Sequence, residues 1–113
     1  MTNEQINELL LEIGRTPLLS QEEELELVEK IQAKGADCDE MRKLEKANMR
    51  FVVSLVKQYQ NQGAAMEELI DAGKEGIRKA ALTYHSDSDI RFPHYAVRQM
   101  RQCMQDAIDF KKK

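Results

Sequence analysis

Residues 47–81, ANMRFVVSLVKQYQNQGAAMEELIDAGKEGIRKAA, decide the fold class of this chain. Their apolar residues recur at helical spacing on both sides of a break at Gly63. The first half is apolar over much of its circumference, which is typical of a helix covered by neighbours on several sides. The second half carries Gly73 and Gly76, and each glycine costs about 1 kcal/mol relative to alanine inside a helix. Such glycines indicate close backbone packing or a bend, so the stretch predicts two long, packed helices.

Two further helices are predicted before this stretch. The first carries apolar residues at helical spacing and is expected to stop at Gly14, before a linker at residues 15–19. Pro17 in that linker disfavours helical backbone at the residue before it. Ser20, followed by Glu23 three residues later, is a capping-box signature for the start of the second helix. We expect the second helix to bury three apolar residues: Leu25, Val28 and Ile31.

The remaining boundaries follow from capping and turn residues. Asp37 is expected to cap the third helix, which runs to about Gln62. The fourth helix is expected to start around Ala65. Residues 85–91, HSDSDIR, read as a polar loop. The last helix is predicted from Pro93 to about Phe110, with proline at the first helical position.

These elements predict an all-α helical bundle of about five helices. We expect an N-terminal helical arm at residues 1–35, packed on a main three-helix domain at residues 36–113. A chain of 113 residues suits one domain with a small appendage. It is long enough to bury roughly two-thirds of its unfolded surface around one core.

The distribution of charge restricts where a nucleic acid could bind. The net charge of −3 argues against general affinity for nucleic acid. Residues 1–40 carry three bases against eleven acids, and residues 41–90 carry eight bases against seven acids. Residues 91–113 carry six bases against two acids. Only the C-terminal end is therefore expected to approach phosphate.

Several functional classes are disfavoured by the absence of their motifs. The sequence has no phosphate-binding glycine loop, nucleophile elbow or zinc motif, so we expect no enzymatic activity and no metal or other cofactor. Cys38 and Cys103 have neither disulfide-framework nor metal-ligand spacing and are expected to be free thiols. No apolar run approaches the ~20 residues that a membrane span requires. We expect a cytoplasmic protein without membrane association.

Four segments carry a resemblance to a known family. They are residues 12–31 (EIGRTPLLSQEEELELVEKI), 47–59 (ANMRFVVSLVKQY), 69–81 (LIDAGKEGIRKAA) and 92–97 (FPHYAV). In this order they resemble parts of bacterial primary sigma factors: the segment before the main domain, the long core helix, the helix that docks on the polymerase clamp, and the start of the promoter-melting helix. They cover nearly the whole chain. The resemblance implies a protein of transcription initiation that binds RNA polymerase core and promoter DNA.

The resemblance implies a polymerase-binding face on the fourth helix. In the family this helix binds a coiled coil of the clamp in the largest polymerase subunit. The matching positions here are Glu68, Asp71, Ala72, Lys74 and Arg78. Ala72 lacks the family's carboxylate, while Lys74 and Arg78 introduce positive charge, and a lysine that meets a basic partner face costs affinity. We expect clamp binding to be weakened or redirected; the alternative is a solvated helix face without a partner.

The resemblance also implies binding of single-stranded promoter DNA by the last helix. Aromatic residues there stack on bases flipped from the duplex, worth ~1–3 kcal/mol per base. In this chain Ile90 stands at one aromatic position, and Arg98–Gln99 replaces the family's tryptophan pair. Arginine binds phosphate and stacks on bases but is a poor wedge. Phe92 and Tyr95 match two of the family's aromatic positions; the alternative is that they belong to the core. The DNA-binding candidates are Arg91, Phe92, His94, Tyr95, Arg98, Gln99 and Arg101.

Two functions remain open from the sequence. The first is a sigma-factor-like initiation protein that binds polymerase core and single-stranded promoter DNA. The second is a degenerate regulatory module that keeps the fold as a protein-interaction surface without opening promoters. Such a module could occupy the polymerase clamp or titrate an anti-sigma factor. Family members continue into a helix-turn-helix domain beyond the last helix, so we expect a divergent and truncated member.

Overall fold

A computed structural model describes residues 2–112, which form five helices and no strand. The all-α prediction is confirmed. In chain order the helices are α1 (Asn3–Arg15), α2 (Gln21–Lys34), α3 (Asp39–Tyr59), α4 (Met66–Thr83) and α5 (Phe92–Lys112). None of these helices is both long and apolar enough to cross a membrane.

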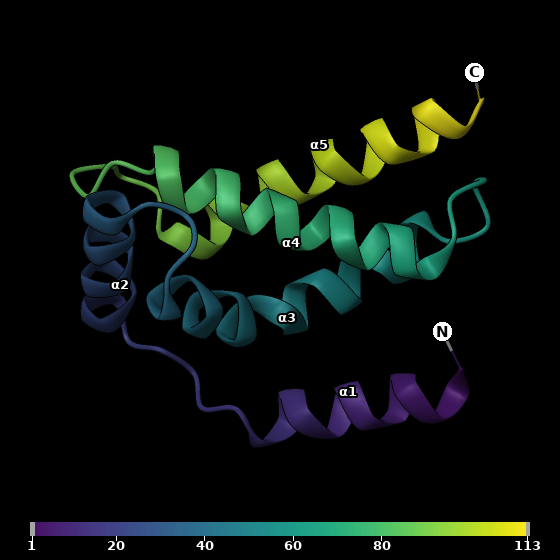
Figure 1. The fold of residues 1–113 in the computed structure, drawn as a ribbon, viewed down its shortest axis with the longest axis horizontal. Helices are drawn as coiled ribbons and strands as arrows, with labels where there is room; N and C mark the ends of the chain where they lie inside the picture. Colours follow the sequence, from purple (N-terminus) through teal and green to yellow (C-terminus); the bar gives the residue numbers. More distant parts are fainter. Residues whose placement is uncertain (1, 113) are drawn as a thin grey trace.

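Helices α3, α4 and α5 form the body of the bundle, as Figure 1 shows. Helix α2 stands across one end of this body, beside the loop that joins α4 to α5. Helix α1 lies along α3 at the edge of the molecule (Figure 1). The core is continuous from α2 through α3 and α4 to α5, and its largest fully buried side chains are Ile31, Met41, Leu44, Leu69, Ile77, Phe92, Met100, Met104 and Ile108.

The glycines of α4 allow it to approach its neighbours closely, as the sequence predicted. A Cβ atom on Gly76 would lie 2.5 Å from the Cα atom of Met100 in α5. A Cβ atom on Gly73 would lie 2.6 Å from a methyl carbon of Val52 in α3. Both glycines are buried. They therefore serve packing between helices, and α4 continues through them to Thr83.

The start of α2 is as predicted. The Ser20 side chain accepts a hydrogen bond from the backbone N–H of Glu23 at 3.1 Å. The Glu23 carboxylate accepts one from the backbone N–H of Ser20 at 3.0 Å, which completes the capping box. These bonds hold the pKa of Glu23 below its ordinary value. Of the expected inward stripe, Val28 and Ile31 are buried, but Leu25 is only half-buried.

The expected boundary residues of α1 and α3, Gly14 and Asp37, do not act as predicted. Helix α1 continues through Gly14 to Arg15 and ends at Thr16, whose backbone N–H bonds to the carbonyls of Glu12 and Ile13. Pro17 follows directly, so proline rather than glycine stops the helix. Helix α3 begins after Cys38, which makes no side-chain cap. The expected cap Asp37 instead forms an ion pair with Arg42 at 3.5 Å.

The last helix begins one residue earlier than predicted, at Phe92, so Pro93 is its second residue. Helix α3 ends at Tyr59, three residues before the predicted end, and the chain then turns through Asn61 and Gly63 at positive φ. Helix α5 extends to Lys112, two residues beyond the predicted end.

Candidate functional site

The four polymerase-binding candidates Glu68, Asp71, Lys74 and Arg78 lie at helical spacing along α4. Glu68 is already engaged within the chain. Its carboxylate accepts a hydrogen bond from the backbone N–H of Ala65 at 3.0 Å, at the N-terminus of α4. It also pairs with Lys111 of α5, with 3.1 Å between the charged atoms. These two interactions lower the pKa of Glu68, so its negative charge is locally stabilised and partly neutralised.

Arg78 is compensated in a similar way. Its guanidinium donates a hydrogen bond to the Glu45 carboxylate of α3 at 2.8 Å. The Glu45 side chain is only 16% exposed, so the pair lies against the helix–helix contact. The bond to Glu45 raises the pKa of Arg78. The positive charge of Arg78 therefore stabilises the packing of α3 against α4, while part of its side chain remains on the surface.

Asp71 and Lys74 differ from these two residues. Asp71 is exposed, and neither residue forms an ion pair or hydrogen bond with another described residue. Lys74 is half-buried at a cleft of about 250 Å³ between α1, α3 and α4. Leu9 and Ile13 of α1 and Met49 of α3 supply the apolar part of its lining. Ala72 packs partly against the core.

The DNA-binding candidates divide into buried and exposed groups. Phe92 is 1% exposed and packs edge-on against Tyr84, with 5.5 Å between the ring centroids. In this conformation its ring offers no face to a base. Tyr95 is half-buried, and its hydroxyl shares a 2.7 Å hydrogen bond with the Thr83 hydroxyl. Gln99 is half-buried, with its backbone beside Gly76 where α5 crosses α4.

His94, Arg98 and Arg101 form the exposed group. Their spacing of four and three residues places them on one face of α5. The Arg101 guanidinium donates a hydrogen bond to the side-chain oxygen of Gln58 in α3 at 3.1 Å. Arg98 has no ion-pair partner among the described residues. This face therefore presents positive charge to solvent.

Arg91 lies at the start of α5 and is tied to α2. Its guanidinium forms an ion pair with Glu24, a carboxylate whose side chain is 5% exposed. The Gln32 side chain of α2 donates to the carbonyls of Ala81 and Tyr84 at 3.0 and 2.8 Å. The Tyr84 hydroxyl in turn donates to the carbonyl of Ile90 at 2.5 Å, and burial raises the pKa of that hydroxyl.

This network was not predicted from the sequence. Glu24 is one of three consecutive acids at the start of α2, and no local pattern separates it from Glu22 and Glu23. Its partner stands 67 residues away. Only the folded arrangement, in which α2 crosses the α4–α5 loop, brings the two residues together (Figure 1).

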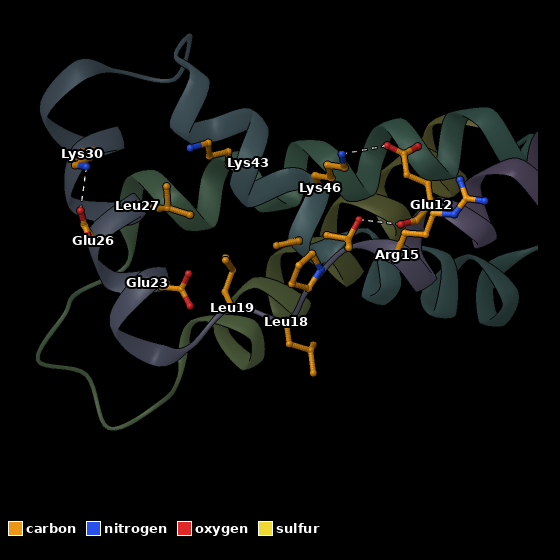
Figure 2. A pocket seen from close by; sticks show the side chains of 13 residues that line it. Glu12, Arg15, Leu18, Leu19, Glu23, Glu26, Leu27, Lys30, Lys43 and Lys46 are labelled. Carbon is orange, nitrogen blue, oxygen red and sulfur yellow. Dashed lines mark hydrogen bonds and ion pairs between the residues drawn. The ribbon is translucent and has the colours of Figure 1, made fainter.

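A wider groove of about 570 Å³ lies between the linker at residues 15–19, α2 and α3. Figure 2 shows the side chains of Leu18, Leu19 and Leu27, which all line this groove. Leu18 is 72% exposed. Ion pairs flank the groove: Lys30 with Glu26 at 3.0 Å and Lys46 with Glu12 at 3.5 Å. Sequence reasoning missed this groove, because apolar residues in a linker do not by themselves indicate a cavity.

Within residues 2–112, no three side chains of the metal-ligating types lie close enough together to hold a metal ion. Both cysteines are free thiols. Cys103 is buried, and desolvation raises the pKa of its thiol.

Comparisons with known proteins match nearly the whole chain. The family model for sigma-70 factor region 1.2 matches residues 10–36, and the model for sigma-70 region 2 matches residues 44–113. The RNA polymerase sigma factor SigA of a Bacillus species is 37% identical over 94% of this chain and 28% of the relative. SigA of Clostridium acetobutylicum is 39% identical over 88% of this chain and 26% of the relative. SigA4 of Synechococcus elongatus is 35% identical over 96% of this chain and 41% of the relative.

The chain thus spans between about a quarter and two-fifths of the length of these relatives. Residues 37–43, which end the α2–α3 connection and begin α3, lie between the two matched regions. The family resemblance inferred from the four sequence segments is confirmed.

Proposed function

Because the chain belongs to the sigma-70 family, we propose that it acts in transcription initiation as a non-enzymatic protein that binds RNA polymerase core and single-stranded promoter DNA. One observation carries this proposal. The region 2 match covers residues 44–113, which include all of α4 and α5, and so both candidate faces. The two faces lie on neighbouring, closely packed helices.

The polymerase half of the proposal assigns the outward face of α4 to the clamp coiled coil of the largest subunit. Glu68, Asp71, Lys74 and Arg78 are the contact residues. A pull-down with core polymerase at low salt tests it, using the wild-type chain and an Asp71→Lys variant. Asp71 is exposed and pairs with none of the described residues, so its reversal is expected to weaken retention without unfolding the chain. Glu29→Lys, on the exposed side of α2, is the matched control for net charge. Absence of wild-type retention would contradict this half.

The DNA half assigns the exposed α5 face to the phosphates of the single strand. The direct contacts are His94, Arg98 and Arg101. Tyr95 offers a partly exposed ring for a base to stack on. The helix itself is held in place by Arg91, Phe92 and Gln99. Fluorescence anisotropy with a single-stranded promoter oligonucleotide measures the affinity. For single strands, each lost phosphate contact lowers the salt slope of the binding constant by about 0.7. An Arg98→Ala, Arg101→Ala variant is therefore expected to bind more weakly and to lose about 1.4 units of that slope.

Lys43→Ala is the matched control for the DNA measurement. Lys43 is an exposed base of α3 that lines the groove beside the linker. Its removal is expected to leave the salt slope nearly unchanged. Equal binding by wild type and the double arginine variant would remove the proposed DNA face, and an Arg98→Ala, Tyr95→Ala variant then tests the stacking contribution separately.

A second candidate function is favoured by particular positions. Arg98–Gln99 stands in place of the tryptophan pair, and Phe92 is packed in the core. These features suit a regulatory module that uses the fold for protein interaction, at the polymerase clamp or with an anti-sigma factor, without opening promoters. An abortive-transcription assay separates the two functions. Promoter-specific product supports the initiation role, whereas inhibition of an authentic sigma factor supports the regulatory role.

A further inference from the structure

We propose that Lys74 determines partner choice by receiving a carboxylate of the partner protein at the cleft between α1, α3 and α4. The inference rests on the proposed function, because it concerns the α4 face assigned to RNA polymerase. It makes that assignment more specific. The partner is expected to present a basic side chain towards Asp71 and an acidic side chain towards Lys74, one helical turn apart.

The other charged side chains that line the cleft are paired within the chain. Glu12 pairs with Lys46 at 3.5 Å. Glu45 pairs with Arg78 at 2.8 Å. The remaining charged lining residue, Arg42, pairs with Asp37 and Asp39. Among the described residues that line the cleft, Lys74 alone is a charged side chain without a partner inside the molecule.

Lys74 is half-buried, and leucine, isoleucine and methionine side chains line the cleft beside it. A partner that covers this cleft removes water from the lysine ammonium. A buried charge without a counter-charge is costly, so a tight complex needs an anion there. The two carboxylates that line the cleft, Glu12 and Glu45, are paired with other bases, so a carboxylate from the partner satisfies the requirement.

On the rest of this helix face, Asp71 and Glu75 are exposed, lie four residues apart and have no ion-pair partner among the described residues. They favour a base on the partner. Lys74 lies beside them, towards α1 and α3. The face therefore carries both signs of charge in a fixed order, and a partner with uniformly basic charge is disfavoured at Lys74.

Binding of core polymerase to four versions of the full chain tests the inference: wild type, Lys74→Gln, Lys74→Glu and Lys79→Glu. Lys79 is an exposed base on the same helix, and its side chain contacts Cys103 of α5, on the α5 side of α4. We expect Lys74→Glu to weaken binding about ten-fold or more and Lys74→Gln about three-fold. Lys79→Glu is expected to stay within about two-fold. Raising the salt concentration should reduce the effect of Lys74→Glu, because salt screens charge pairs.

The outcomes distinguish this inference from the function on which it rests. If core polymerase does not retain the wild-type chain, the proposed function fails and this inference fails with it. If the wild type is retained and Lys74→Glu binds equally well or more tightly, the proposed function stands and the partner surface at Lys74 is not acidic. Equal losses for Lys74→Glu and Lys79→Glu would also overturn the inference, since net charge would then explain both. Circular dichroism spectra confirm that the variants are folded.

Discussion

The crossing of α4 and α5 predicts that Gly76→Ala destabilises the fold, although alanine is the better helix former. The new Cβ atom would lie 2.5 Å from the Cα atom and 2.6 Å from the backbone nitrogen of Met100. Ordinary contact begins at 3.4 Å, so the two helices would have to separate by about 0.9 Å. Met100 is fully buried, and a separation at this point therefore opens the core around it.

The magnitude follows from two opposing effects. Overpacking a well-packed core costs about 1–3 kcal/mol. Alanine recovers about 1 kcal/mol relative to glycine inside a helix. The obstacle here is backbone, which cannot rotate away as a flexible side chain can. We therefore expect the overpacking cost to lie in the upper part of that range. After the gain in helix propensity, Gly76→Ala should lower the free energy of unfolding by about 2 kcal/mol.

Urea unfolding followed by far-UV circular dichroism measures this loss. With a slope of about 1–2 kcal/mol per molar urea, the midpoint of Gly76→Ala should fall by about 1–2 M. Gly14→Ala is the matched control, because Gly14 also lies within a helix but its added Cβ would meet nothing within 4 Å. That variant should gain up to about 1 kcal/mol. A Gly76→Ala midpoint equal to or above that of the wild type would refute the reasoning.

Three other predictions concern the helix caps and the α4–α5 loop. Ser20→Ala removes the acceptor at the start of α2 and should lower the unfolding free energy by about 1 kcal/mol, whereas Ser20→Thr should lose less; equal losses would contradict the capping role. Tyr84→Phe removes the hydrogen bond to the Ile90 carbonyl and should cost about 1 kcal/mol by urea unfolding, so an unchanged midpoint would mean that water replaces the hydroxyl. Hydrogen bonds lower the pKa of three glutamates, Glu23, Glu40 and Glu68, so the stability that these carboxylates contribute is complete above their ordinary pKa of 4.5 and is lost as the pH falls through the lowered values. Replacing all three by glutamine should therefore flatten the acid side of a plot of melting temperature against pH. An unchanged slope would mean that these residues do not cause the acid sensitivity of the fold.

The helices were predictable because their signals are local. A capping box and a periodic apolar stripe involve residues a few positions apart, and the start of α2 and the burial of Val28 and Ile31 follow from them. The close packing at Gly73 and Gly76 was predictable for a related reason, since glycine inside a helix needs a compensating contact. The sequence could not specify which neighbour each glycine meets.

The wrong predictions at Gly14 and Asp37 show where local rules compete. Gly14 and Pro17 both end helices, and the backbone of α1 stays helical until proline forbids it. At the start of α3, Asp37 had the right chemistry for a cap, but its carboxylate pairs with Arg42. A cap and an ion pair use the same oxygen atoms, and no local pattern ranks one above the other.

The charges on α4 could not be interpreted from the sequence alone, because residues of other helices determine whether each charge is paired. From the sequence, Lys74 and Arg78 were two equivalent positive charges on a face that binds a basic partner in the family. In the fold, Glu45 of α3 compensates Arg78 and Lys111 of α5 compensates Glu68. Lys74 has no ion-pair partner among the described residues and lies at a cleft that α1 helps to form. Any change in partner preference at this face should therefore depend on Lys74 far more than on Arg78, and α1 is expected to contribute to that preference because its residues line the cleft in which the lysine lies.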